Sequence, residues 1–235
     1  MKLAITILMF VAMCMLPAMG AYTANDWAAR GDQLSQSGSY DTAVASYDRA
    51  LDLDQNNSTI LVSKGLALAH LGKYADAVDS FDKATLLNSS NADAWYYKGT
   101  ALSMNLGEYD EGITCLDKAL ELNPNNFDAL IIKGIALDNA SRLDEALATF
   151  DSAIRLNPLD PKGWNDKGVV LRDQGKYNDA LDCFNKAIEL DPNYEPAQTN
   201  KELALQNINQ AQQDDFYELD HMLDASRESQ GTNMM

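Results

Sequence analysis

Apolar residues recur along this chain with helical spacing, in stretches of about 14 residues. Successive stretches are separated by short turns such as Gly38-Ser39 and Gly72-Lys73, which predicts pairs of helices. The pair pattern itself repeats, and a glycine recurs at intervals of 34, 34, 35 and 34 residues. The five glycines are Gly31, Gly65, Gly99, Gly134 and Gly168. A period of this length predicts a stack of helix pairs.

The repeated glycines fall within predicted helices, where a glycine costs about 1 kcal/mol relative to alanine. We therefore expect each glycine to allow a close approach of two helices. A bulky apolar residue recurs at one phase of the second helix, and its five occurrences are Tyr47, Phe81, Leu116, Phe150 and Phe184. Because one helix pair cannot bury its apolar face alone, stability must come from stacking on neighbouring pairs.

The fifth unit carries the full motif of Trp164, Lys167-Gly168, Tyr177, Ala180, Phe184, Ala187 and Pro192. This motif resembles the tetratricopeptide-repeat (TPR) family, and all five units fit it. The resemblance implies an all-α fold, a right-handed α-solenoid of stacked antiparallel helix pairs. Two departures stand out: four units have Lys where the family has Leu before the glycine, and the third unit has one extra residue near Met104–Leu106. We expect the extra residue to lengthen the turn of that unit.

The period breaks after Tyr194, because Glu202 stands where the next glycine would fall. The following polar-faced segment is expected to cap the last repeat, as terminal units of solenoids do. The predicted organisation is a signal peptide at 1–20, repeats at 24–57, 58–91, 92–126, 127–160 and 161–194, a capping helix at 195–213, and an acidic, partly disordered tail at 214–235.

The first twenty residues are typical of a secretory signal peptide. Lys2 precedes an apolar run from Leu3 to Leu16, and Ala18 and Gly20 supply small residues before a cleavage site. Cleavage near Gly20 predicts a secreted or cell-surface protein with no remaining membrane span. The alternative is an uncleaved segment that anchors the chain in the membrane.

The amino-acid composition disfavours several classes of partner and of functional site. With 18 Lys and Arg against 35 Asp and Glu, the formal net charge is −17, which disfavours nucleic acid as a partner. Two histidines and three cysteines leave little for a metal site or a histidine-based catalytic set. We expect no catalysis, no metal and no cofactor. Cys115 and Cys183 lie two repeats apart, too far for an intramolecular disulfide.

The resemblance implies that the first helix of each pair lines an inner groove that binds a protein or peptide segment. The lining of the first unit includes Asp32 and Gln36, and the expected contact residues of the other units are Val62, Leu66, Tyr96, Thr100, Asp128, Ile131, Ile135, Asp138, Asn165, Val169, Arg172 and Asp173. No register supplies the lysine and asparagine clamp with which some family members bind a C-terminal carboxylate. The sequence thus predicts a non-catalytic interaction scaffold. The alternative is an assembly factor that self-associates through its open ends and acidic tail, where Phe216, Leu219 and Leu223 lie at helical spacing.

Overall fold

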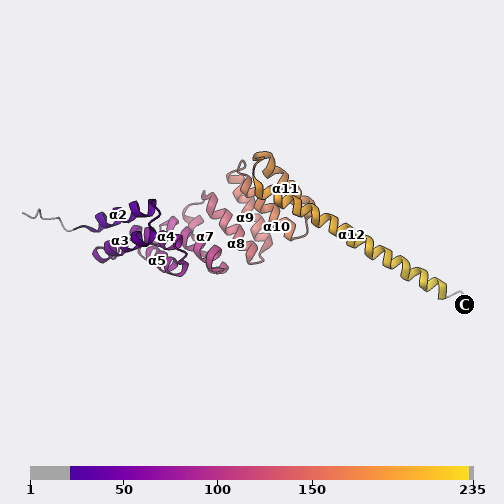
Figure 1. Cartoon of the computed structure of the whole chain (residues 1–235), viewed down its shortest axis with the longest axis horizontal. Coiled ribbons are helices and arrows are strands. Elements are labelled where there is room, and N and C mark those ends of the chain that lie inside the picture. The colour runs from indigo at the N-terminus through magenta and orange to yellow at the C-terminus, as the bar shows by residue number, and fades with distance from the viewer. Residues whose placement is uncertain (1–21, 233–235) are drawn as a thin grey trace, which may run out of the picture. The chain divides into compact units, whose positions relative to one another are not determined.

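The computed structural model describes residues 22–232, so the expected signal peptide at 1–20 lies outside the described residues. Every regular element in this range is a helix, and the labels of Figure 1 begin at α2. The chain divides into two compact units at Ala101 and Leu102. None of the described helices combines the length and the apolar character needed to cross a bilayer.

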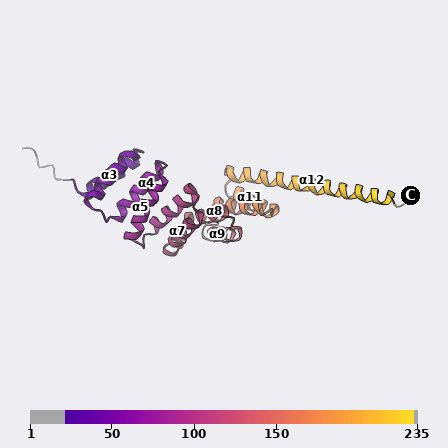
Figure 2. The ribbon, with the colours of Figure 1, turned by 90° about the horizontal axis from the view of Figure 1, so that it is seen from below.

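The first unit consists of consecutive helices that pack on one another in chain order (Figure 2). Its helices are α2 (Ala24–Gln36), α3 (Tyr40–Leu53), α4 (Ser58–His70), α5 (Tyr74–Leu87) and α6 (Ala92–Thr100). The second unit follows the same plan. It contains a π-helix, η1 (Ala101–Leu106, beginning at the boundary residue), then α7 (Tyr109–Leu122), α8 (Phe127–Asn139), α9 (Leu143–Leu156), α10 (Pro161–Asp173), α11 (Tyr177–Leu190) and α12 (Glu195–Thr232). The predicted all-α architecture of helix pairs is confirmed.

Short polar residues start the first helix of each pair, which we call the A helix; the second is the B helix. The side chain of each N-cap accepts a hydrogen bond from a backbone N–H in the first turn, which satisfies one of the exposed donors there. These caps are Thr23, Asn57, Asn91, Asn126 and Asp160. The turn from A to B passes through a residue with positive φ, which is glycine in four turns and Ser141, at φ 60°, in the turn before α9.

The repeated glycines allow the close helix contact that the sequence predicts. A Cβ on Gly134 would lie 2.5 Å from the Phe150 ring, and the equivalent distance from Gly168 to Phe184 is also 2.5 Å. Gly31 and Gly65 make the same contact with the rings of Tyr47 and Phe81. Real side chains do not approach so closely, so a ring can pack here only against a glycine.

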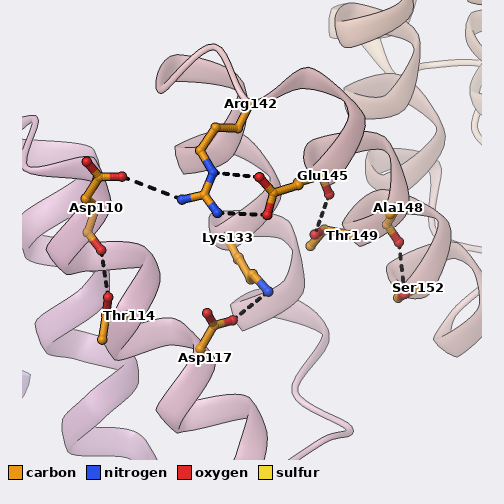
Figure 3. Close-up of polar contacts among 9 residues, drawn as sticks. All are labelled: Asp110, Thr114, Asp117, Lys133, Arg142, Glu145, Ala148, Thr149 and Ser152. Atoms are coloured by element: carbon orange, nitrogen blue, oxygen red, sulfur yellow. Dashed lines mark hydrogen bonds and ion pairs between the residues drawn. The ribbon is translucent and has the colours of Figure 1, made fainter.

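The lysine before the glycine, a departure from the family motif, forms an ion pair with an aspartate on the preceding B helix. The four lysine–aspartate pairs are Lys64–Asp48 (2.6 Å), Lys98–Asp82 (2.7 Å), Lys133–Asp117 (2.5 Å) and Lys167–Asp151 (2.7 Å). Figure 3 shows the pair of Lys133 and Asp117. Each pair joins one helix pair to the next and therefore helps to fix the stacking register.

Arg142, at the N-cap of α9, adds a second polar contact between neighbouring helix pairs (Figure 3). Its guanidinium donates two hydrogen bonds to Glu145, at 2.8 and 2.7 Å, and lies 3.5 Å from Asp110 of α7. Like the lysine–aspartate pairs, this contact lies within one unit.

Two features differ from the expectations. The extra residue of the third repeat does not lengthen the turn; it is absorbed by the π-helix η1, which accommodates one more residue inside a helix. The backbone N–H of Glu108 accordingly bonds to the carbonyl of Leu102, six residues back, where the other units span five. In addition, α12 does not end near residue 213 but continues to Thr232, since no glycine or proline interrupts it between Pro196 and Gly231.

Candidate binding face

The A helices of the second unit place three apolar residues in one row. Helices α8, α10 and α12 contact one another in this order, and Ile135, Val169 and Leu203 are spaced 34 residues apart on them. Ile135 and Val169 are partly buried, and Leu203 is 40% exposed. We call this row and the polar residues beside it the A-helix face of the second unit.

Leu203 is absent from the predicted contact residues, although the 34-residue period locates it. The sequence predicts a polar cap here because Glu202 replaces the expected glycine. In the structure α12 nevertheless packs as a sixth A helix, with Ala197 and Ala204 fully buried against the preceding pair. Extending the register by one more period would have identified Leu203.

Acidic residues with one shared cation border the apolar row. Arg172 lies 2.9 Å from Asp173, and both follow Val169 on α10. Asp138 of α8 stands near them. Burial raises the pKa of the Asp138 carboxyl, the nearby Asp173 carboxylate raises it further, and Arg172 partly opposes this effect. One guanidinium therefore serves two carboxylates, and this part of the face retains negative charge.

A chain of hydrogen bonds joins α10 to α12. Arg172 donates to the Asn200 side-chain carbonyl (3.2 Å), Asn200 donates to Asn165 (2.9 Å), and Asn165 donates to Asp166 (2.9 Å). Burial raises the pKa of Asp166, and its Oδ2 atom is buried with no hydrogen-bond partner among the described residues. Sequence reasoning missed Asn200, which holds α12 in place and orients Arg172.

Two of the predicted contact residues are not accessible. Ile131 is fully buried in the core of the second unit, packed with Ile113, Leu137 and Phe150. Asn165 is 4% exposed and is used in the hydrogen bonds to α12. Neither side chain is therefore open to a partner in this structure. Asp128, also predicted, is exposed at the start of α8.

The predicted residues of the first unit serve mainly its own packing. Val62 and Leu66 are partly buried against the core, and the ring of Tyr96 lies 5.1 Å from that of Tyr97. The Thr100 hydroxyl donates to the carbonyl of Tyr96 at 2.9 Å.

The cysteines and the potential metal ligands form no further site among the described residues. Cys115 and Cys183 are both buried, and neither forms a disulfide among the described residues; burial raises the pKa of the Cys183 thiol to about 11. Within residues 22–232, no group of three His, Cys, Asp or Glu side chains is placed to hold a metal ion. The A-helix face offers apolar surface and negative charge, which suit binding.

Three family models match parts of the chain. A tetratricopeptide-repeat model matches residues 161–194, a second one matches 102–161, and the model of anaphase-promoting complex, cyclosome, subunit 3 matches 36–119. No curated protein matches the chain.

Solved structures share the fold. YrrB, described as a TPR protein with an unusual peptide-binding site, is 29% identical with a TM-score of 0.68, over 78% of this chain and 94% of YrrB. MamA is 27% identical with a TM-score of 0.68, over 72% of this chain and 92% of that one. MamA from Desulfovibrio magneticus RS-1 is 25% identical with a TM-score of 0.70, over 75% of this chain and 99% of that one. Family models and structures together support a TPR protein, and these neighbours suggest a protein–protein interaction scaffold. TPR scaffolds are generally non-catalytic.

Proposed function

We propose that this protein is a non-catalytic scaffold whose A-helix face in the second unit binds a partner segment carrying apolar and basic residues. The observation that carries the proposal is the row of Ile135, Val169 and Leu203 beside the acidic pair of Asp138 and Asp173. Apolar surface left open beside uncompensated charge is typical of interaction sites. YrrB is described as having a peptide-binding site, which supports a peptide segment as the ligand of this chain.

Photo-crosslinking tests the location of the site. A benzophenone amino acid at position 203 should crosslink a partner in the native extract, whereas the same group at position 159 should not. Leu159 is the matched control because it belongs to the same unit and is more exposed, at 75% against 40% for Leu203. Equal crosslinking from both positions would contradict the proposal.

Substitution then tests the affinity for the captured partner. Leu203→Asp should weaken binding at least tenfold while the circular dichroism spectrum stays unchanged, and Leu159→Asp should leave binding within twofold. Ile131→Asp is unsuitable, since a charge at this fully buried position would unfold the unit. If Leu203→Asp binds as well as Leu159→Asp, the A-helix face is not the site.

A second candidate function is self-association through α12. Beyond the repeats this helix presents Phe216, Tyr217 and Met222, which are 72%, 67% and 62% exposed. A scaffold of this kind would form oligomers that disappear when residues 214–235 are removed. Light scattering after size exclusion would show the same monomer mass for both chains if the tail plays no such part.

We also propose that the protein is exported, on the strength of the apolar run and small residues in 1–20. Mass spectrometry of the protein from its native source should find an N-terminus at Ala21. An intact Met1 in a membrane fraction would instead support the anchored alternative.

A further inference from the structure

A cavity of about 390 Å³ lies among α2, α3 and α4 of the first unit, apart from the A-helix face of the second unit. Apolar surface from Leu66 and Ala67 lines one part of it. The rings of Tyr40 and His70 also line it, stacked with centroids 4.4 Å apart and planes inclined by 7°.

The polar part of the cavity is built on Tyr47, which occupies the phase held by phenylalanine or leucine in the other units. Its ring packs on Gly31, and the hydroxyl donates a hydrogen bond of 2.8 Å to Oδ1 of Asp32. Ser35 lies 3.4 Å from the same hydroxyl. Burial raises the pKa of Tyr47, so the phenol keeps its proton and remains a donor to Asp32. Only in this repeat does the ring carry a group that fixes an acid on the A helix.

The carboxylate of Asp32 is thus oriented yet open. Asp32 is exposed, and it belongs to none of the lysine or arginine ion pairs among residues 22–232. The hydroxyls of Ser35 and Ser63 line the same cavity near the Tyr47 hydroxyl, and each keeps lone pairs that can accept a hydrogen bond. A cation entering from solvent would meet a carboxylate whose position is already set, which lowers the entropic cost of binding it.

The lining of the cavity suits a long cationic side chain, that of lysine or arginine. Lysine and arginine carry an aliphatic stem that packs on apolar surface and a charged head that seeks acceptors. Leu66 and Ala67 offer the apolar wall, and Asp32 with the serine hydroxyls offers the acceptors. The net charge of −17 further raises the local concentration of cationic ligands.

We propose that this cavity binds the cationic side chain of a partner segment, with Asp32 as the counter-ion and Tyr47 holding that carboxylate in place. The proposal rests on the proposed function only for the source of the side chain. The cavity itself can be tested without any partner protein.

Nuclear magnetic resonance titration of the ¹⁵N-labelled chain provides the test. The probes are the Nα-acetyl N-methylamides of lysine and arginine, and the same derivative of norleucine is the uncharged control. Both cationic probes should give saturable shifts at the amides of Asp32, Ser63 and His70, with at least tenfold higher affinity than norleucine. The probe that saturates at the lower concentration identifies an ammonium or a guanidinium as the preferred head.

Variants distinguish specific binding in the cavity from nonspecific electrostatic attraction of the cationic probes to an acidic protein. Asp32→Asn should weaken both cationic probes at least tenfold, while Asp52→Asn, which removes an equal charge from an exposed position on α3, should leave them within twofold. Tyr47→Phe restores the residue of other repeats and should weaken binding two- to fivefold because Asp32 loses its positioning donor.

Three results would overturn the proposal: equal binding of norleucine, equal effects of Asp32→Asn and Asp52→Asn, or shifts spread over all acidic residues. Leu203→Asp lies in the other unit and should leave these titrations unchanged. Failure here and failure of the proposed partner site are therefore distinguishable.

Discussion

The lysine–aspartate pairs lead to a prediction about the stability of the second unit. In the pair of Lys133 and Asp117, the atoms Nζ and Oδ1 are 2.5 Å apart, and the side chains are 23% and 48% exposed (Figure 3). Neutralising the aspartate leaves a mostly covered ammonium without its counter-ion. Removing the lysine leaves a carboxylate that water can still reach. The two single substitutions should therefore have unequal costs.

The exposed fractions of the two side chains determine how much each substitution should change the free energy of unfolding. A hydrogen bond to a charged group contributes roughly 1.5–3 kcal/mol when it is buried, and an exposed ion pair roughly 0.2–1 kcal/mol. This pair lies between these limits, so we expect Asp117→Asn to cost about 1–2 kcal/mol in free energy of unfolding. Lys133→Leu introduces the family residue, and we expect a change within about 0.5 kcal/mol because replacing an ion pair with apolar packing is often neutral. The double variant should resemble Lys133→Leu.

Urea unfolding followed by circular dichroism measures these differences. With a slope of about 2 kcal/mol/M, Asp117→Asn should lower the midpoint by roughly 0.5–1 M. Glu121→Gln is the surface control, since its pair with Lys118 is 64% and 44% exposed, and it should lower the midpoint far less. If Asp117→Asn costs no more than Glu121→Gln, or if Lys133→Leu costs as much as Asp117→Asn, the reasoning fails.

Three further predictions concern single residues. Ser141→Gly should stabilise the protein by about 1 kcal/mol in thermal unfolding, because Ser141 has φ 60° where the other turns use glycine; an unchanged or lower melting temperature would refute this. Asp166→Asn should raise stability at pH 7, because burial raises the pKa of Asp166 in the folded state and its ionisation opposes folding. The gain should vanish as the pH falls below the ordinary value of 3.8, where both states are protonated, and a gain that persists there would contradict the explanation. In a Cys14→Ala, Cys115→Ala background, Cys183 is the remaining thiol, and its pKa of about 11 means that labelling by a disulfide reagent should stay slow at pH 8 and become fast on unfolding; fast labelling of the folded chain would show that the thiol is open.

The sequence by itself determined the order of the helices, their pairing and the contact that joins each pair. This was possible because each bulky ring of a B helix meets a glycine only 16 residues earlier, as Phe150 meets Gly134. Because this contact joins residues close in the chain and recurs along the repeats, it appears in the sequence as a glycine and a bulky residue at a regular spacing. The turns between the A and B helices were equally predictable, since each contains a glycine at positive φ, except the turn at Ser141.

Only the tertiary structure decided which A-helix residues remain open to a partner. Ile131 and Ile135 lie about one helical turn apart and look equivalent in the sequence, yet Ile131 is fully buried in the core while Ile135 stays partly exposed. The placement of Asp32 depends likewise on a hydroxyl from α3. Exposure is set by the side chains of neighbouring repeats, which vary from one unit to the next, so the period that predicts the fold cannot predict the site.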